Sequence, residues 1–140
     1  MSRIFYTEAA DALVGFLPRA FRGARTSVSA RNLKVWFDEP REHYEIQTVG
    51  RRVLEIGFHA EHPAADANDT VLERLLRRRA SWRKTLAAAE AGEFLGAPRP
   101  WRRLSETWDS AASDEPGAAV EAAERLATYI KALEPVRRAK

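Results

Sequence analysis

Hydrophobic and polar residues alternate along the stretch from Val28 to Ala60, in a pattern typical of β-strands that bury one side. We expect three strands here, at about Val28–Phe37, His43–Val49 and Arg52–His59. Side chains two positions apart on a strand share one face, so one side of this predicted sheet is apolar. The predicted core face carries Leu33, Val35, Ile46, Leu54, Ile56 and Phe58.

Apolar residues spaced three or four apart predict helices on either side of these strands. The first helix is expected at about Glu8–Leu17, capped by Thr7. The longest helix is expected from Asp69 or Thr70 to about Ala91. A fourth strand is expected at about Trp101–Trp108.

A last helix is expected after a cap at Ser113 or Asp114, with Pro116 in its first turn. Its predicted buried face carries Val120, Ala123, Ala127, Ile130 and Leu133. The element order is then α-β-β-β-α-β-α, and 140 residues suit a single domain. The sequence therefore predicts an α+β domain, with a short antiparallel meander packed by the long helix and the terminal helices.

Composition excludes several classes of function. The chain has no cysteine, which rules out disulfides, thiol catalysis and cysteine-ligated zinc. No apolar run approaches the roughly 18–20 residues of a membrane helix, and no secretory signal is evident, so we expect a soluble cytoplasmic protein. Phosphate-binding and dinucleotide-binding glycine motifs are absent, and we expect no cofactor. The net charge of +3 is compatible with an anionic partner without requiring one.

The polar face of the predicted sheet is the first candidate site. A loop at Val49–Arg51 keeps the apolar residues on one face and sets Glu45 directly across from Glu55. His43, Gln47 and His59 lie nearby in this register. Facing carboxylates repel unless a metal ion, a proton or an arginine intervenes. Glu45, Glu55 and His59 would then serve a metal-dependent enzyme, with Glu45 and Glu55 binding the ion. The alternative, which we favour here, is a hydrated or arginine-neutralised face, because antiparallel sheets often leave one face in water.

A second candidate is the group His59, Glu61 and His62, with Asp66 beyond it. Imidazoles and carboxylates at this density can bind zinc. Their spacing matches no established ligand motif, and ordinary surface positions for Glu61 and His62 are the favoured alternative.

A third candidate is a basic surface on the longest helix and the segment that follows it. The predicted binding residues are Arg74, Arg77, Arg78, Lys84, Trp101, Arg102 and Arg103. Such a surface suits phosphates, with tryptophan available for base stacking. The alternative is the hydrated face of an ordinary helix. At about 100° per residue, one face of this predicted helix forms a leucine stripe made of Leu72, Leu75, Leu76, Trp82 and Leu86. The same helical wheel places Arg79 and Arg83 within this stripe, where we expect one of them to pair with an acidic side chain.

The order α-β-β-β-α-β resembles the core of restriction-endonuclease-like PD-(D/E)XK nucleases. In this resemblance Glu45 matches the acid of the second strand and Glu55 the acid of the third, which implies metal-dependent cleavage of a phosphodiester. Gly57 stands where those nucleases carry a catalytic lysine. The stretch from Arg78 to Pro135 also looks like bacterial domains that have been associated with such nucleases.

We favour a non-catalytic binding module that contacts nucleic acid or an acidic protein through the arginine-rich helix. A metal-dependent hydrolase or nuclease-like enzyme that uses the Glu45 and Glu55 face is the alternative, so enzymatic activity stays open. A third interpretation is an interaction subunit whose outer sheet face, with Trp36, docks on a partner or on a second copy.

Overall fold

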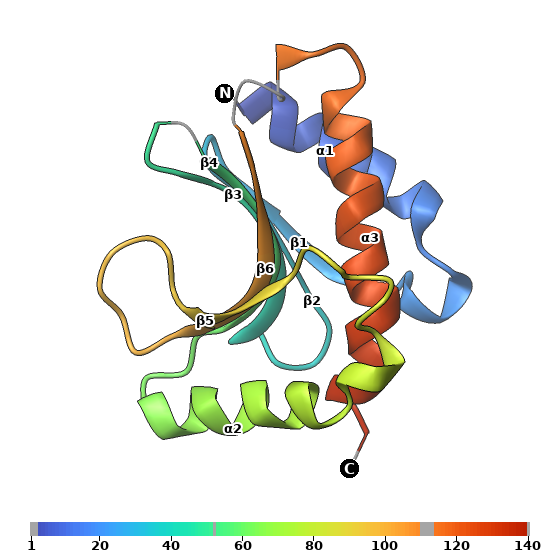
Figure 1. Ribbon diagram of the computed structural model, residues 1–140. Helices are drawn as coiled ribbons and strands as arrows, with labels where there is room; N and C mark the ends of the chain where they lie inside the picture. Colours follow the sequence, from blue (N-terminus) through green and yellow to red (C-terminus); the bar gives the residue numbers. More distant parts are fainter. Residues whose placement is uncertain (1–2, 52, 110–113, 140) are drawn as a thin grey trace.

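The computed structural model describes residues 3–51, 53–109 and 114–139, and it confirms an α+β fold. Its elements, drawn in Figure 1, are α1 (Arg3–Phe16), β1 (Arg25–Val28), β2 (Asn32–Trp36), β3 (Glu42–Val49), β4 (Val53–Ala60), α2 (Ala65–Arg77), β5 (Glu90–Glu93), β6 (Arg102–Asp109) and α3 (Ala118–Arg137). Short 3₁₀ turns at Arg19–Phe21 and Arg79–Ser81 interrupt the connections.

In the described part of the chain, six strands form one antiparallel sheet in the order β1-β2-β3-β4-β6-β5. The first four strands are a meander, and the β5–β6 hairpin extends the sheet beyond β4. Helices α1 and α3 lie together on one face, whereas α2 crosses near one end of the sheet (Figure 1). The sheet therefore has one face covered by two helices and another face that they do not reach.

The core lies between this sheet face and the two terminal helices. Cross-strand rows such as Val35, Tyr44, Phe58 and Leu104 are buried against α1 and α3. Every residue of the predicted core face, from Leu33 to Phe58, is at most 1% exposed. Because alternation alone predicted this face, the apolar pattern of the strands was sufficient to place the core.

Two strands were not predicted. The expected first strand, Val28–Phe37, corresponds to β2, whereas β1 ends at Val28 and is joined to β2 by a tight turn. The Ser29 hydroxyl accepts hydrogen bonds from the backbone N–H groups of Arg31 and Asn32 at 3.1 Å and donates to Asn32 Oδ1 at 2.6 Å. Serine and asparagine bonded in this way stabilise a turn in place of a continuous strand. The other unpredicted strand, β5, begins within residues that the predicted long helix would have included.

The longest predicted helix is shorter than expected and begins earlier. Helix α2 ends at Arg77, where the Trp82 indole N–H donates to the carbonyl of Leu75 at 2.9 Å and the Ser81 hydroxyl donates to that of Arg78 at 2.7 Å. These side-chain donors satisfy carbonyls at the end of the helix. Beyond that point the helical wheel no longer applies.

The prediction that Arg79 or Arg83 pairs with an acidic side chain is therefore wrong. Both side chains are exposed, and Arg79 donates to the carbonyl of Leu76 at 3.1 Å. Because α2 has already ended, neither arginine is held in the leucine stripe.

The terminal helices also differ in detail from the prediction. Helix α1 begins at Arg3, so Thr7 lies inside it instead of capping it. Helix α3 begins after Gly117, so Asp114 is not its cap and Pro116 belongs to the preceding turn; Ser113 lies outside the described residues. On the predicted buried face of α3, Val120 is 47% exposed and the other four residues are buried.

Within the described residues, no helix is long and apolar enough to span a membrane.

Candidate metal centre

The pairing of β3 with β4 sets the geometry of the polar sheet face. Val49 pairs with Val53, so Gln47 lies across from Glu55 and Glu45 lies across from Gly57. The predicted opposition of Glu45 and Glu55 is therefore wrong by two residues. A shift of two positions keeps every side chain on its face, so both carboxylates still lie on the polar side.

Gly57 has a packing role on this face. A Cβ atom at Gly57 would lie 2.5 Å from both Cα and Cβ of Ser105 and 2.6 Å from the carbonyl oxygen of Leu104. Strand β6 can therefore approach β4 closely only because residue 57 has no side chain. This approach brings the Ser105 hydroxyl to 2.5 Å from Glu55 Oε2, to which it donates.

Two histidines and two glutamates converge at the end of the β3–β4 pair. One possible ligand atom from each of His43, Glu45, His59 and Glu61 lies within 4.8 Å of those of the other three residues. Glu45 Oε1 is 2.9 Å from His43 Nε2 and 3.0 Å from His59 Nδ1. Glu61 Oε2 is 3.3 Å from the same atom of His43 and 3.1 Å from that of His59. We call these four residues the His–Glu cluster.

The cluster is enclosed by the protein. His43, Glu45 and His59 are at most 2% exposed, and the Glu61 side chain is 10% exposed. The ring of Phe94, the residue that follows β5, contacts His59 edge-on at 5.5 Å between centroids, and it contacts Trp101 in the same way at 4.9 Å. The β5–β6 hairpin thus brings aromatic side chains to this region of the face.

A second set of groups holds the cluster in place. His43 Nδ1 is 2.9 Å from the carbonyl oxygen of Pro40, and His59 Nε2 is 2.8 Å from Glu55 Oε2. Gln47 donates to the other oxygen of Glu55 at 2.6 Å, and Asn32 donates to Glu45 Oε2 at 2.9 Å. Each imidazole is therefore fixed through the nitrogen that points away from the cluster, as in metal sites whose ligating histidines are oriented by an acceptor.

These contacts also define the charges. Both nitrogens of each ring face an oxygen atom, so each ring can donate at both nitrogens when it is an imidazolium. Burial lowers the pKa of His59, but attraction to Glu55 and hydrogen bonds to three glutamates outweigh it, and the pKa is raised well above its usual value. Burial likewise lowers the pKa of His43, yet its bonds to Glu45 and Glu61 raise it overall. Conversely, burial raises the pKa of Glu45, and its histidine partners lower it overall.

The first two candidate sites of the sequence are thus parts of a single arrangement. The favoured hydrated or arginine-neutralised face is wrong, since Glu45 and Glu55 are buried and the histidines carry the compensating contacts. Glu55 bonds to His59 Nε2, the nitrogen that points away from the cluster, and it is not one of the four converging residues. His62 pairs with Glu42 at 2.8 Å, and Asp66 is exposed in the first turn of α2.

The predicted arginine surface is divided among separate positions. Arg74, Arg77 and Arg78 line a hollow of about 350 Å³ beside Val136 and Ala139 of the C-terminal segment. Arg102 pairs with Asp69 at 2.7 Å. Arg103 is buried and belongs to the polar sheet face, since it lies across from His59. Lys84 is exposed, and Trp101 contacts Phe94 and the guanidinium of Arg99.

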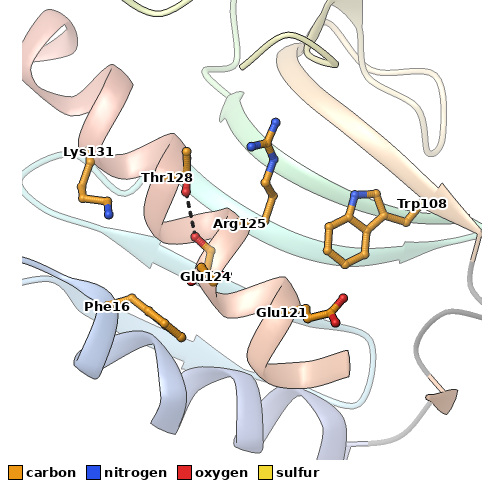
Figure 2. Close-up of a pocket in the computed structure, with 7 residues that line it drawn as sticks. All are labelled: Phe16, Trp108, Glu121, Glu124, Arg125, Thr128 and Lys131. Carbon is orange, nitrogen blue, oxygen red and sulfur yellow. Dashed lines mark hydrogen bonds between the residues drawn. The ribbon is translucent and has the colours of Figure 1, made fainter. Parts of the chain in front are cut away.

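A larger hollow, of about 450 Å³, lies along the outer side of α3 (Figure 2). Figure 2 shows acidic, basic and hydroxyl side chains of α3 around it, together with Phe16 of α1 and Trp108 of β6. Arg125 and Trp108 both bind the carboxylate of Glu106, at 2.7 and 2.8 Å, and are thus already engaged in the fold. This hollow belongs to the helical side of the sheet, away from the His–Glu cluster.

No family model, curated protein or solved structure matches this chain. The resemblance to PD-(D/E)XK nucleases accordingly stays a prediction, and the case for a function comes from the site itself.

Sequence reasoning placed His43 and His59 near Glu45 on the polar face, but it assigned Glu61 to a separate group and did not join all four residues. The signal was present as two His-x-Glu patterns, His43–Glu45 and His59–Glu61, one in β3 and the other at the end of β4. The observed register, with His43 across from His59, brings these patterns together on one face of the antiparallel pair. The missing information was therefore the register, which depended on where the hairpin loop began.

Proposed function

We propose that this protein binds a divalent transition-metal ion through His43 Nε2, His59 Nδ1 and the carboxylates of Glu45 and Glu61. The observation that carries the proposal is the convergence of four ligand atoms within 4.8 Å. It is supported by the acceptors behind each ring, Pro40 for His43 and Glu55 for His59. One divalent ion would replace the two imidazolium protons without changing the net charge of the buried cluster.

The ligand types select the class of metal. Two imidazole nitrogens with two carboxylate oxygens suit Zn²⁺, Mn²⁺, Fe²⁺ or Co²⁺, whereas Mg²⁺ and Ca²⁺ prefer oxygen ligands alone. Such an ion supplies Lewis-acid chemistry, by polarising a bound oxygen or acidifying a water molecule. We therefore propose a metal-dependent hydrolase as the activity class.

Thermal unfolding with added metal tests this proposal. Saturating Zn²⁺ or Mn²⁺ should stabilise the wild-type protein by about 2.7 kcal/mol at one hundred times Kd, which raises Tm by roughly 5–10 °C for a chain of this size. Mg²⁺ should have little effect. Glu45→Gln and His59→Gln should lose the shift, because each removes a ligand.

His62→Gln is the matched control for this experiment. His62 lies close to the cluster along the chain, but it pairs with Glu42. Its replacement should leave the metal-dependent shift intact. Absence of a shift with every transition metal, or an equal shift in the Glu45 and His59 variants, would contradict a metal centre at this position.

We propose the arginine-lined hollow as a second, separate candidate site. Arg74, Arg77 and Arg78 face one hollow of about 350 Å³, and Arg77 and Arg78 are exposed. Clustered guanidinium groups suit the phosphates of a nucleic acid. Arg74 also donates to the carbonyl oxygens of Arg137 and Ala139, at 3.1 and 2.5 Å, so its position is held by the C-terminal segment. Binding here would be independent of the metal.

A further inference from the structure

Arg103 extends the row of residues that contains both histidines of the cluster. On the polar face His43 lies across from His59, His59 from Arg103, and Arg103 from Gly92 of β5. Directly opposed residues of antiparallel strands share a face, with Cα atoms about 4.5–5.5 Å apart. A cation therefore lies one strand away from a proposed metal ligand. It is nevertheless buried, with only 8% of its surface exposed.

The hydrogen bonds of Arg103 are incomplete. One terminal nitrogen donates to the hydroxyl and the carbonyl oxygen of Ser105, at 2.9 and 3.3 Å. Ser105 in turn donates to Glu55, which supports His59, so Arg103 is linked to the cluster through two side chains. Arg103 Nε is buried and has no hydrogen-bond partner among the described residues. Buried polar groups are rarely left unpaired, so this N–H indicates an acceptor supplied from outside the chain.

Charged side chains of both signs lie on this face. The carboxylates are those of Glu45, Glu55 and Glu61, together with Glu90 of β5, which lies across from Ser105. A bound divalent ion, Arg103 and Lys34, whose ammonium group is 3.9 Å from Glu61, would balance them. Among the described side chains, the buried group that lacks an acceptor is the Nε–H of Arg103. The planar guanidinium group matches the geometry of a carboxylate better than a lysine would.

An apolar surface lies beside the same row. Phe94 contacts His59 edge-on, and Trp101 contacts Phe94 in the same way, so the two aromatic rings follow one another from the histidine outwards. These rings would contact the carbon skeleton of an organic ligand, as aromatic side chains do in small-molecule sites.

We propose that Arg103 and the metal centre together bind a small organic carboxylate, the Arg103 Nε–H donating to a carboxylate oxygen. This inference rests on the proposed metal centre and names the class of ligand that it takes. Ser105 positions the guanidinium group, and Phe94 and Trp101 contact the apolar part of the ligand.

Cobalt-substituted protein offers a direct test, because the visible absorption of Co²⁺ reports changes around the ion. Benzoate is the probe, with acetate and inorganic phosphate as comparison anions and chloride to match ionic strength. In the wild type, benzoate should change the spectrum with saturation, and it should bind more tightly than acetate because of the aromatic rings. Phosphate, which is tetrahedral and more highly charged, should bind more weakly than either carboxylate.

Arg103→Met should weaken benzoate binding by about tenfold or more, the factor that corresponds to the loss of one charged hydrogen bond. Arg103→Lys keeps the charge but lacks the Nε–H, and it should also bind more weakly than the wild type. Arg102→Met is the matched control, since Arg102 is adjacent in sequence, points to the other face and pairs with Asp69. It should leave benzoate affinity unchanged.

The outcomes separate this inference from the metal proposal. Failure of the wild type to take up Co²⁺ overturns both. Uptake of Co²⁺ with a spectrum that benzoate does not alter overturns the carboxylate site alone, and this measurement needs only the wild type. Equal benzoate affinity in wild type and a folded Arg103 variant also overturns it, and would indicate that a water molecule bonds to Arg103 Nε.

Discussion

His43 and His59 couple the stability of the metal-free protein to pH. The pKa of each is raised in the folded state, because burial is outweighed by contacts with Glu45, Glu55 and Glu61. A raised folded-state pKa contributes stability that is complete below the unfolded value of about 6.5 and is lost as pH rises through the folded value. On the acidic side, burial of Glu61 is outweighed by its histidine bonds, which lower its pKa to about 2.

We therefore predict that the free energy of unfolding of the metal-free protein falls as pH rises above about 6.5. It should also fall as pH decreases from about 4.5 towards 2, as the carboxylates become protonated. Urea unfolding between pH 3 and 9, in the presence of a chelator, measures both limbs. His59→Gln should flatten the alkaline limb, and His62→Gln should not. An alkaline limb that is the same in His59→Gln and in the wild type would show that the cluster is not responsible.

Metal binding should have the opposite pH dependence. The ion competes with protons for His43 and His59, so affinity should increase as pH rises through the range in which the rings lose their protons. Protons on His43 and His59 thus stabilise the folded protein at low pH, and a metal ion bound to the same side chains stabilises it at higher pH.

At the scale of elements, the contact between β4 and β6 depends on Gly57. We predict that Gly57→Ala destabilises the protein by roughly 1–3 kcal/mol, because its Cβ would overlap the backbone of Ser105 and neither strand can move without disturbing its neighbours. Gly15→Ala is the control, since Gly15 lies in α1 and a methyl group there would meet no described atom within 4 Å. That change should be neutral or stabilising by about 0.5–1 kcal/mol.

Urea denaturation of the two alanine variants measures this difference directly. Gly57→Ala should also reduce metal affinity, since Ser105 and β6 hold Glu55 behind His59. Equal stability of the two variants would mean that the sheet accommodates a methyl group at residue 57. The absence of lysine at this position, which set the chain apart from PD-(D/E)XK nucleases, thus has a packing reason.

The strands were predicted well where the alternation of apolar and polar residues was strict. Strands β3, β4 and β6 begin and end within one or two residues of their expected limits. The long helix was predicted less well. Trp82 and Leu86 have helical spacing from Leu75 and are buried, but they lie in turns that follow the helix. Periodicity reports which residues face the core and cannot by itself exclude another backbone path that buries the same residues.

The site was less predictable than the fold for a related reason. Glu45, Glu55 and His59 were singled out because alternation assigns them to a face, and that assignment is confirmed. The register of β3 against β4 and the close approach of β6 decide which of these side chains are in contact. A pattern within one strand contains neither piece of information. The Nε–H of Arg103, which is unpaired in the described part of the chain, was beyond sequence reasoning altogether, since no sequence pattern shows which buried donors lack an acceptor.

At the scale of the whole molecule, the sheet separates two kinds of burial. One face packs apolar side chains against α1 and α3, and the other encloses charged groups near the β5–β6 hairpin. A further ionic group lies at the end of α3, where buried Glu134 accepts hydrogen bonds from Tyr44 and Arg137, and Arg137 also pairs with Asp38 and Glu42. This network joins the last helix to the connection between β2 and β3.

The arrangement of cations over the whole molecule gives a test of the second candidate site. The double variant Arg77→Glu, Arg78→Glu should weaken binding to duplex DNA by about tenfold or more at low salt, and binding should weaken steeply as salt rises. Fluorescence anisotropy with a labelled duplex measures both effects. Arg19→Glu with Arg25→Glu makes the same change in net charge at exposed positions of the N-terminal segment. Equal losses in the two double variants would indicate general attraction and no site at the hollow.

All four proposed metal ligands belong to the β3–β4 hairpin or follow it directly, within residues 43–61. Their spacing is consequently insensitive to insertions or deletions in every other loop. The connection between Val49 and Val53 is the exception, because a shift of a single residue there would turn Glu45 towards the helices and bring Tyr44 to the polar face. A change in the length of this one connection would therefore remove the metal centre while leaving the composition of the chain almost unchanged.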